Sequence, residues 1–93
     1  MTYLENILDK LHSFITNLET LYDDIFRETY KNDLTKIVTK SSNDTDKFFV
    51  QLGSDIDQIK LIYDKITENN IVIKSDLVLI NEKYKKYKSV GDV

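Results

Sequence analysis

Apolar side chains recur through the first 25 residues at alternating steps of three and four, which is a heptad seam. The seam consists of Leu4, Ile7, Leu11, Phe14, Leu18, Leu21 and Ile25. A second row beside it is formed by Leu8, Ile15 and Tyr22, so three positions in seven are apolar. This stripe is wider than a two-stranded coiled coil needs, and it predicts a helix that is covered on two sides.

The start of this helix is predicted by a capping box. Thr2 is followed three residues later by Glu5, and in such a pair each side chain binds the backbone amide of the other residue. We therefore expect the helix to begin at Tyr3.

The end of this helix has two interpretations. Beyond Ile25 the apolar residues follow at steps near four, as far as Val38. Continuation as one helix over 3–38, with a stutter in the frame, is favoured because no Gly or Pro intervenes. The alternative is a stop near residues 31–33 and a short second helix from Leu34.

A polar run over residues 40–44 predicts a loop, and a second heptad frame opens after it. The frame predicts a helix over 45–69 with the same wide stripe. Its apolar members are Phe48, Leu52, Ile59, Ile62 and Ile66 on the seam and Phe49, Ile56 and Tyr63 beside it.

Two residues interrupt the second frame. Asp55 falls on the seam where an apolar residue is expected, and Gly53 lies inside the helix at a cost near 1 kcal/mol relative to Ala. The pair is consistent with a close approach of helices or with a device that sets their register. We favour the other interpretation, a helix turn that is partly exposed to solvent.

The last quarter of the chain predicts a short third helix. Asn70 is a suitable left-handed residue to end the second helix. Residues 71–73 are β-branched and are expected to run extended over the end of the bundle. A helix over 76–88, capped by Ser75 or Asp76, then follows. Its apolar face consists of Leu77, Ile80, Tyr84 and Tyr87.

These elements predict an all-α fold in a single domain, residues 1–93. A first helix over 3–38 would be roughly 54 Å long, so the molecule should be elongated. The expected fold is an antiparallel helical hairpin with a short third helix, completing a coiled-coil-like bundle. A third helix of about 13 residues covers only part of the side of the hairpin that remains open. We therefore expect the uncovered part of the apolar stripe to pack against partner helices.

The predicted partner interface combines the two apolar stripes. It consists of Leu4, Ile7, Leu8, Leu11, Phe14, Ile15, Leu18, Leu21, Tyr22, Ile25, Phe48, Phe49, Leu52, Ile56, Ile59, Ile62, Tyr63 and Ile66.

Catalytic, metal and cofactor motifs are missing from the sequence. There is no cysteine, and His12 is the only histidine, without the HExxH or ExxH spacing of a metal site. Gly53 and Gly91 are isolated, which excludes a phosphate-binding glycine loop. We therefore expect no enzymatic activity, no metal and no cofactor.

One segment interleaves lysine with tyrosine, namely residues 83–88. Tyrosine can stack on bases while lysine neutralises phosphates, so a weak contact with nucleic acid or an anionic membrane is one interpretation. The preferred interpretation places Tyr84 and Tyr87 in the core and the lysines at a helix C-terminus, where cations are favourable. The net charge of −3 also makes nucleic-acid binding unexpected.

The function predicted from these patterns is that of a non-catalytic helical subunit or adaptor of a larger intracellular assembly. A hetero-complex is favoured and a homo-oligomer is the nearest variant. The alternative is an acidic regulatory binder, such as an inhibitor, immunity or chaperone-type protein. Residues 1–6 show no export signal, no run is long enough to span a bilayer, and the residue usage suggests an AT-rich genome.

Overall fold

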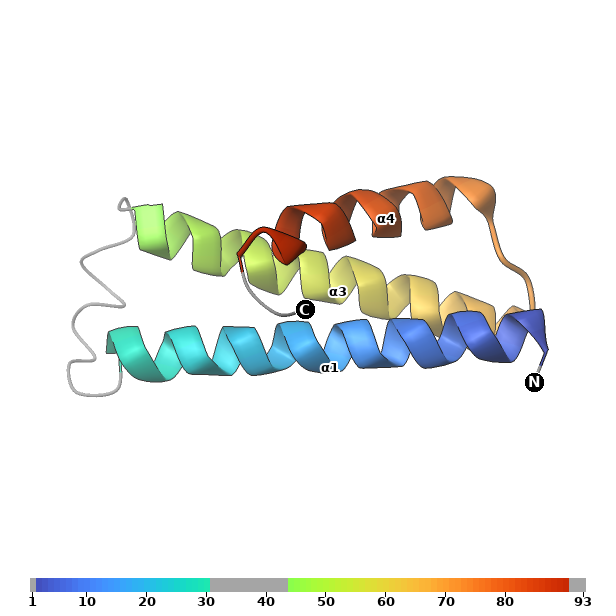
Figure 1. Cartoon of the computed structure of the whole chain (residues 1–93), viewed down its shortest axis with the longest axis horizontal. Coiled ribbons are helices and arrows are strands. Elements are labelled where there is room, and N and C mark those ends of the chain that lie inside the picture. Colours follow the sequence, from blue (N-terminus) through green and yellow to red (C-terminus); the bar gives the residue numbers. More distant parts are fainter. Residues whose placement is uncertain (1, 31–43, 91–93) are drawn as a thin grey trace.

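The computed structural model describes residues 2–30 and 44–90, and in these ranges the chain is entirely helical apart from short connections. The helices, labelled as in Figure 1, are α1 (Tyr3–Tyr30), α3 (Asp44–Asn69) and α4 (Lys74–Lys88). α1 and α3 form an antiparallel hairpin. α4 runs back along α3, so its chain direction is the same as that of α1. The predicted all-α hairpin with a short third helix is confirmed.

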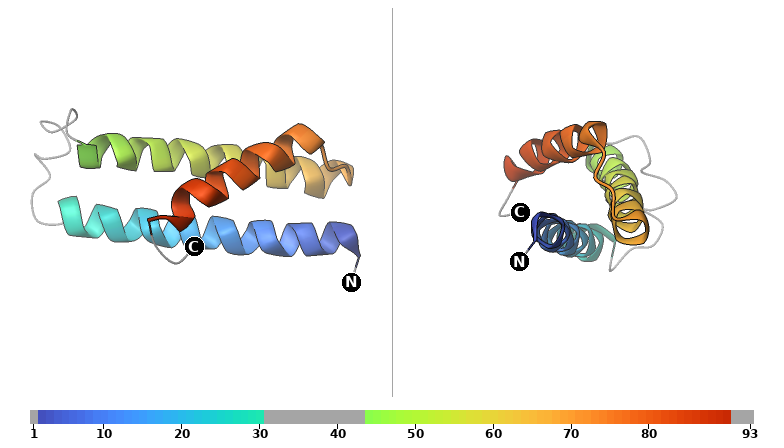
Figure 2. Two further views of the ribbon diagram at one scale, coloured as in Figure 1. Left: turned by 45° about the horizontal axis from the view of Figure 1, so that its top comes forward. Right: turned by 90° about the vertical axis from the view of Figure 1, so that its right-hand side faces the viewer.

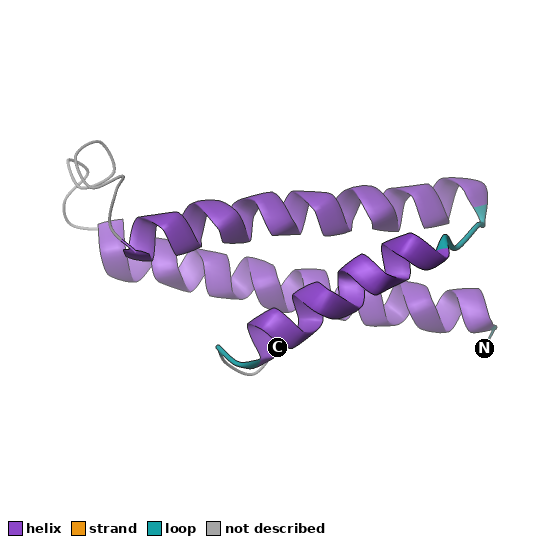
Figure 3. Ribbon diagram, turned by 90° about the horizontal axis from the view of Figure 1, so that it is seen from above, coloured by secondary structure: helices purple, strands orange, loops and turns teal. Residues whose placement is uncertain are grey.

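The molecule is elongated, as its long helices predict. Its principal dimensions are 47 × 24 × 20 Å and its radius of gyration is 15.1 Å. A compact chain of this length would have a radius of gyration of about 12 Å. Figure 2 shows α4 lying obliquely across the hairpin, and Figure 3 shows the same crossing from above. α4 therefore covers only part of the hairpin.

The capping box at the start of α1 is confirmed. The backbone amide of Glu5 donates to the Thr2 hydroxyl at 3.1 Å, and the amide of Thr2 donates to the Glu5 carboxylate at 3.3 Å. Continuation of this helix to residue 38, the alternative break at 31–33 and residues 40–43 of the predicted loop lie outside the described residues. Asp44, expected as the last residue of that loop, is instead the first residue of α3.

The core is built from the two heptad stripes and one residue of α4. α1 contributes Leu11, Phe14, Ile15 and Leu18; α3 contributes Leu52, Ile56, Ile59, Ile62 and Ile66; α4 contributes Tyr87. Leu18, Leu52, Ile59 and Tyr87 have no exposed surface. Both the seam and the row beside it are thus used within the chain.

The end of α3 follows the prediction. Asn70 adopts the left-handed conformation, with φ of 55°, and its amide donates to the carbonyl of Ile66 at 2.9 Å. This single bond is the simple left-handed helix cap.

The connection to α4 differs from the prediction. Val72 packs against the core, but Ile71 and Ile73 are 60% and 44% exposed, so the three residues do not all cover the bundle end. α4 begins at Lys74, two residues earlier than expected, with Ile73 at the cap position and no side-chain cap. Ser75 and Asp76 do not cap the helix, because the Ile73 carbonyl already accepts the first amides and the Asp76 carboxylate pairs with Lys65 at 2.7 Å.

Candidate functional site

Half of the predicted partner interface is buried inside the chain. The buried members are Leu11, Phe14, Ile15, Leu18, Leu52, Ile56, Ile59, Ile62 and Ile66. In the isolated chain these nine side chains pack mainly in its own core, and two of them, Leu11 and Phe14, also line the groove described below. Half-buried positions remain at Leu4, Ile7, Leu8, Leu21, Tyr22, Ile25, Phe48, Phe49 and Tyr63.

One residue of the second row of α1, Tyr22, packs against α3. The rings of Tyr22 and Phe49 stack with their centroids 4.2 Å apart and an angle of 21° between their planes. A Cβ atom on Gly53 would lie 3.2 Å from Cε2 of Tyr22, so the glycine allows this ring to lie against the α3 backbone. The close-approach interpretation of Gly53 is confirmed, and Tyr22, which packs against α3, remains partly exposed.

Asp55 is fully buried between α3 and α4, so the interpretation of a partly exposed turn was wrong. Its Oδ1 accepts a hydrogen bond from Gln51 Nε2 at 2.9 Å and lies 2.8 Å from Lys83 Nζ. Its Oδ2 accepts hydrogen bonds from Lys86 Nζ at 3.0 Å and from the hydroxyl of Tyr87. A buried carboxylate requires such partners, and three of the four come from α4.

The protonation states of this cluster follow from its contacts. Burial alone would raise the pKa of Asp55, but hydrogen bonds from Lys83, Tyr87, Lys86 and Gln51 outweigh burial and hold the pKa well below its ordinary value of 3.8. Burial and the hydrogen bond to Asp55 raise the pKa of the Tyr87 hydroxyl above its ordinary value of 10.0. At neutral pH a charged Asp55 carboxylate therefore accepts a hydrogen bond from the neutral Tyr87 phenol.

The Lys- and Tyr-rich end of α4 is largely engaged in internal contacts. Lys83 and Lys86 pair with Asp55, while the Tyr87 ring lies edge-on to Phe48 with centroids 6.0 Å apart. The Tyr84 ring lies edge-on to Phe14 at 5.4 Å. Tyr87 is buried, in agreement with the preferred interpretation, whereas Tyr84 is 38% exposed and lies at the edge of the core.

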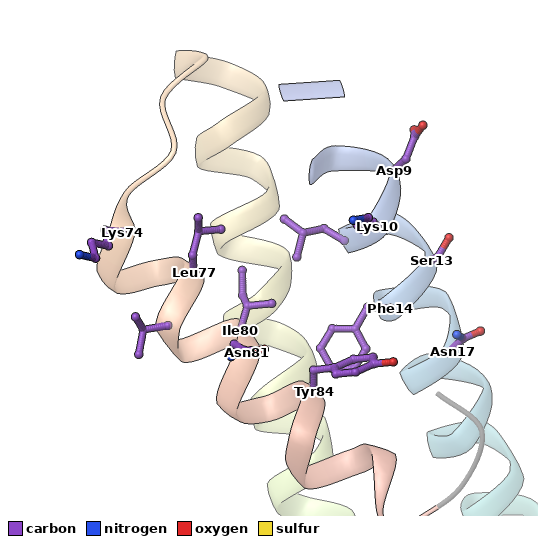
Figure 4. A pocket seen from close by; sticks show the side chains of 12 residues that line it. Asp9, Lys10, Ser13, Phe14, Asn17, Lys74, Leu77, Ile80, Asn81 and Tyr84 are labelled. Atoms are coloured by element: carbon purple, nitrogen blue, oxygen red, sulfur yellow. The ribbon is translucent and has the colours of Figure 1, made fainter. Parts of the chain in front are cut away.

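An apolar groove of about 940 Å³ runs between α1 and α4. Leu11 and Phe14 line it from α1, and Leu77, Ile80 and Tyr84 line it from α4 (Figure 4). The edge-on contact of Phe14 with Tyr84 lies within this lining. The groove exists because α4 runs obliquely and does not follow α1 along its length.

The two lips of the groove differ in charge. On α1, Asp9 and Lys10 offset each other beside Ser13 and Asn17 (Figure 4). On α4, the lip begins with Lys74, Val78 and Asn81, and helical spacing continues it to the exposed Lys85 and Lys88. The α4 lip is therefore basic, and the α1 lip is close to neutral. Val78, 51% exposed, adds apolar surface to the basic lip.

The candidates for metal binding do not gather into a cluster in the described part of the chain. His12 is exposed, with its ring edge-on to Tyr63 at 6.4 Å. No cluster of three or more His, Asp or Glu that could hold a metal ion occurs in residues 2–30 and 44–90. Among the three described helices, none combines the length and apolar character needed to cross a membrane.

The sequence analysis did not predict that Asp55 pairs with residues of α4, although the sequence contains two features that indicate this pairing. An acid on an apolar seam needs buried donors, and residues 83, 86 and 87 present two lysines and a tyrosine at i, i+3 and i+4, on one face of a helix. Matching the two features would have placed the end of α4 against the middle of α3.

Comparison with known proteins adds no assignment: no family model, curated protein or solved structure matches this chain.

Proposed function

We propose that this protein is a non-catalytic helical subunit or adaptor, and that the α1–α4 groove binds an amphipathic helix of a partner protein. The observation that carries the proposal is the groove itself, an apolar trough at the surface beside a hairpin that α4 covers only in part. An amphipathic helix in an apolar groove is a common mode of peptide recognition. A fourth helix in this place would complete a bundle around the existing core.

The charges of the lips define the partner. The flank of the partner helix that faces α4 should be acidic, since Lys74 lines the groove and helical spacing places the exposed Lys85 and Lys88 in the same row of α4, beyond the lining. The flank that faces α1 should be uncharged and polar, because Asp9 and Lys10 offset each other there. Complementary charge of this kind sets orientation and association rate more than affinity.

The alternative of an acidic regulatory binder has less support. Two of the acids of α1 are already paired, Glu19 with Lys60 at 2.7 Å and Asp23 with Arg27 at 3.1 Å. Exposed pairs are weak, but they reduce the net acidic surface available for masking a basic site. The groove has no corresponding role in that model.

The test places a photoreactive amino acid at Val78, which lines the groove, or at Val50, which is 70% exposed on α3 and does not line it. Each protein is incubated with extract of its source cells, irradiated, and the crosslinked peptides are identified by mass spectrometry. We expect position 78, and not position 50, to crosslink to a helical segment with an acidic flank. Equal crosslinking at both positions, or none at position 78, would refute the groove as the binding site.

A further inference from the structure

The heptad frame of α3 continues without a break into α4. Leu52, Ile59, Ile66, Ile73, Ile80 and Tyr87 follow one another at intervals of seven residues. A connection that only reverses the chain direction has no need to preserve this phase. The sequence across the joint is therefore compatible with one helix over residues 44–88, carrying a single apolar stripe.

The joint between the two helices spans residues 70–73, in which Asn70 is left-handed and Ile73 is extended. Asn70 is the only non-glycine residue with positive φ in residues 2–30 and 44–90, and the connection contains neither Gly nor Pro. A right-handed Asn70, together with a change of Ile73 from the extended to the helical conformation, would let α3 run on into α4. It would also bring Ile73, which is 44% exposed in the bent form, into line with Ile66 and Ile80.

The contacts across the joint are symmetric in sequence. Lys65 pairs with Asp76 at 2.7 Å, and Asp55 pairs with Lys86 at 3.0 Å. Within each pair, the two residues lie equally far along the sequence from the Asn70–Ile71 peptide bond. Two straight helices that cross antiparallel at this bond, related by a two-fold axis, would bring the same residues opposite each other between chains.

We propose that α3 and α4 also form one continuous helix, and that two copies of the chain then exchange their α4 helices. In the dimer, the surface of α3 that packs against its own α4 in the monomer packs against α4 of the second copy. The occupant is a second copy because the buried Asp55 needs the donors that Lys83, Lys86 and Tyr87 provide. The exchange needs no new contact apart from those at the joint.

The small number of apolar residues that α4 buries makes such an exchange feasible. Tyr87 is its one buried side chain in the described part of the helix. Leu77, Leu79 and Ile80 are half-buried, and α4 has no side-chain cap at its start. An element with few buried apolar residues opens at lower free energy than the rest of a domain.

The first measurement is the mass of Asn70 variants by size-exclusion chromatography with light scattering. Asn70→Ala favours the right-handed conformation, and Asn70→Gly keeps the left-handed one accessible. We expect Asn70→Ala to lower the dimer dissociation constant on the order of 100-fold, about tenfold for each of two joints. Asn69→Ala is the matched control, because Asn69 is already the last residue of α3, and it should behave as wild type.

The second measurement distinguishes exchange from other dimers. The chain has no cysteine, so spin labels can be placed at Gln58→Cys and Lys85→Cys alone. In a continuous helix these positions are about 40 Å apart, whereas in the bent form they lie nearly opposite each other. Doubly labelled Asn70→Ala mixed with excess unlabelled protein should show the long distance within one chain.

A monomeric Asn70→Ala, or a dimer that retains the short distance, would overturn the proposal. If Asn70→Ala does not fold, the wild-type chain refolded at high concentration provides the same test. A fraction with doubled mass and the long distance would support exchange, and a wholly monomeric product would overturn it. Loss of groove crosslinking at Val78 would not affect either result, so this proposal and the proposed function fail separately.

Discussion

The hydroxyl of Tyr87, on α4, donates a hydrogen bond to the carboxylate of Asp55, on α3, and both side chains are fully buried. The aromatic ring of Tyr87 supplies the apolar contact of α4 with the core, while its hydroxyl satisfies a charge. A purely apolar α4 could slide along the hairpin by a turn at little cost. A single buried carboxylate permits only the placement that brings donors to it.

Removal of the carboxylate should strongly destabilise the protein. Asp55→Leu fits the apolar seam but leaves Lys83 and the Tyr87 hydroxyl without their acceptor. We expect the free energy of unfolding to fall by about 3 kcal/mol, at the lower end for a buried pair because Lys86 is partly exposed. Urea denaturation followed by circular dichroism measures the change.

A compensated variant is the control for this prediction. Asp55→Leu combined with Lys83→Leu and Tyr87→Phe removes the acid together with the two donors that are left most buried. We expect this variant to return to within about 1 kcal/mol of wild type, because a buried ionic cluster is often no more stable than apolar residues of similar volume. A triple variant as unstable as the single one would show that lost pairing does not explain the effect.

The two roles of Tyr87 can be separated by substitution. Tyr87→Phe keeps the ring contact with Phe48 and removes one hydrogen bond to a charge, so we expect a loss of about 2 kcal/mol. Tyr87→Ala also leaves a cavity and should cost about 4 kcal/mol. Thermal and urea unfolding would measure both. Tyr84→Phe, at an exposed position of the same helix, should change stability by less than about 0.5 kcal/mol.

The parts of the fold that were predicted correctly depend on patterns within one helix. The heptad stripes, the capping box at Thr2 and the left-handed Asn70 each involve residues only a few positions apart. Local geometry determines which of these side chains share a face or cap an end, so the sequence is sufficient. The elongated shape follows from the helix lengths.

The parts that were missed depend on pairing between helices. Asp55 was assigned to an exposed turn because its donors are about 30 residues away, on an element whose placement the heptads leave open. The burial of half of the predicted partner residues inside the chain was missed for the same reason. A stripe wide enough for two neighbours does not show which of its residues α3 covers. The groove arises from the oblique path of α4, which no local pattern encodes.

Acid should weaken the attachment of α4. The pKa of Asp55 is lowered in the folded protein, so its contribution to stability is present above pH 4 and is lost as pH falls from there toward the folded value. We expect the free energy of unfolding of wild type to decrease below pH 4 more steeply than that of Asp55→Asn. Urea titrations of both proteins from pH 7 to pH 2 measure this difference. Parallel curves would show that Asp55 is not held in its charged form.

Alkali should act through Tyr87. Its pKa is raised in the folded protein, so the corresponding stability is fully present below about pH 10 and is lost as pH rises beyond this value. Wild type should lose stability between pH 10 and 11.5 more steeply than Tyr87→Phe, which has no phenol to titrate. Ultraviolet absorbance at 295 nm should show one tyrosine that ionises only on unfolding. Its ionisation in the folded protein near pH 10 would contradict the buried hydrogen bond.

The contact of Gly53 with Tyr22 makes the effect of a methyl group depend on the ring. Gly53→Ala gains about 1 kcal/mol in helix propensity, but the new Cβ would lie 3.2 Å from Cε2 of Tyr22 and force a ring stacked on Phe49 to shift. We expect the two effects to offset each other, with a net change in the free energy of unfolding below about 0.5 kcal/mol.

A Tyr22→Leu background is the control for this prediction. The ring is absent there, so Gly53→Ala should stabilise the protein by about 1 kcal/mol. A double-mutant cycle by urea denaturation gives the coupling energy. The same gain in both backgrounds would mean that the glycine is not needed for the ring, and the close approach of α1 to α3 would require another cause.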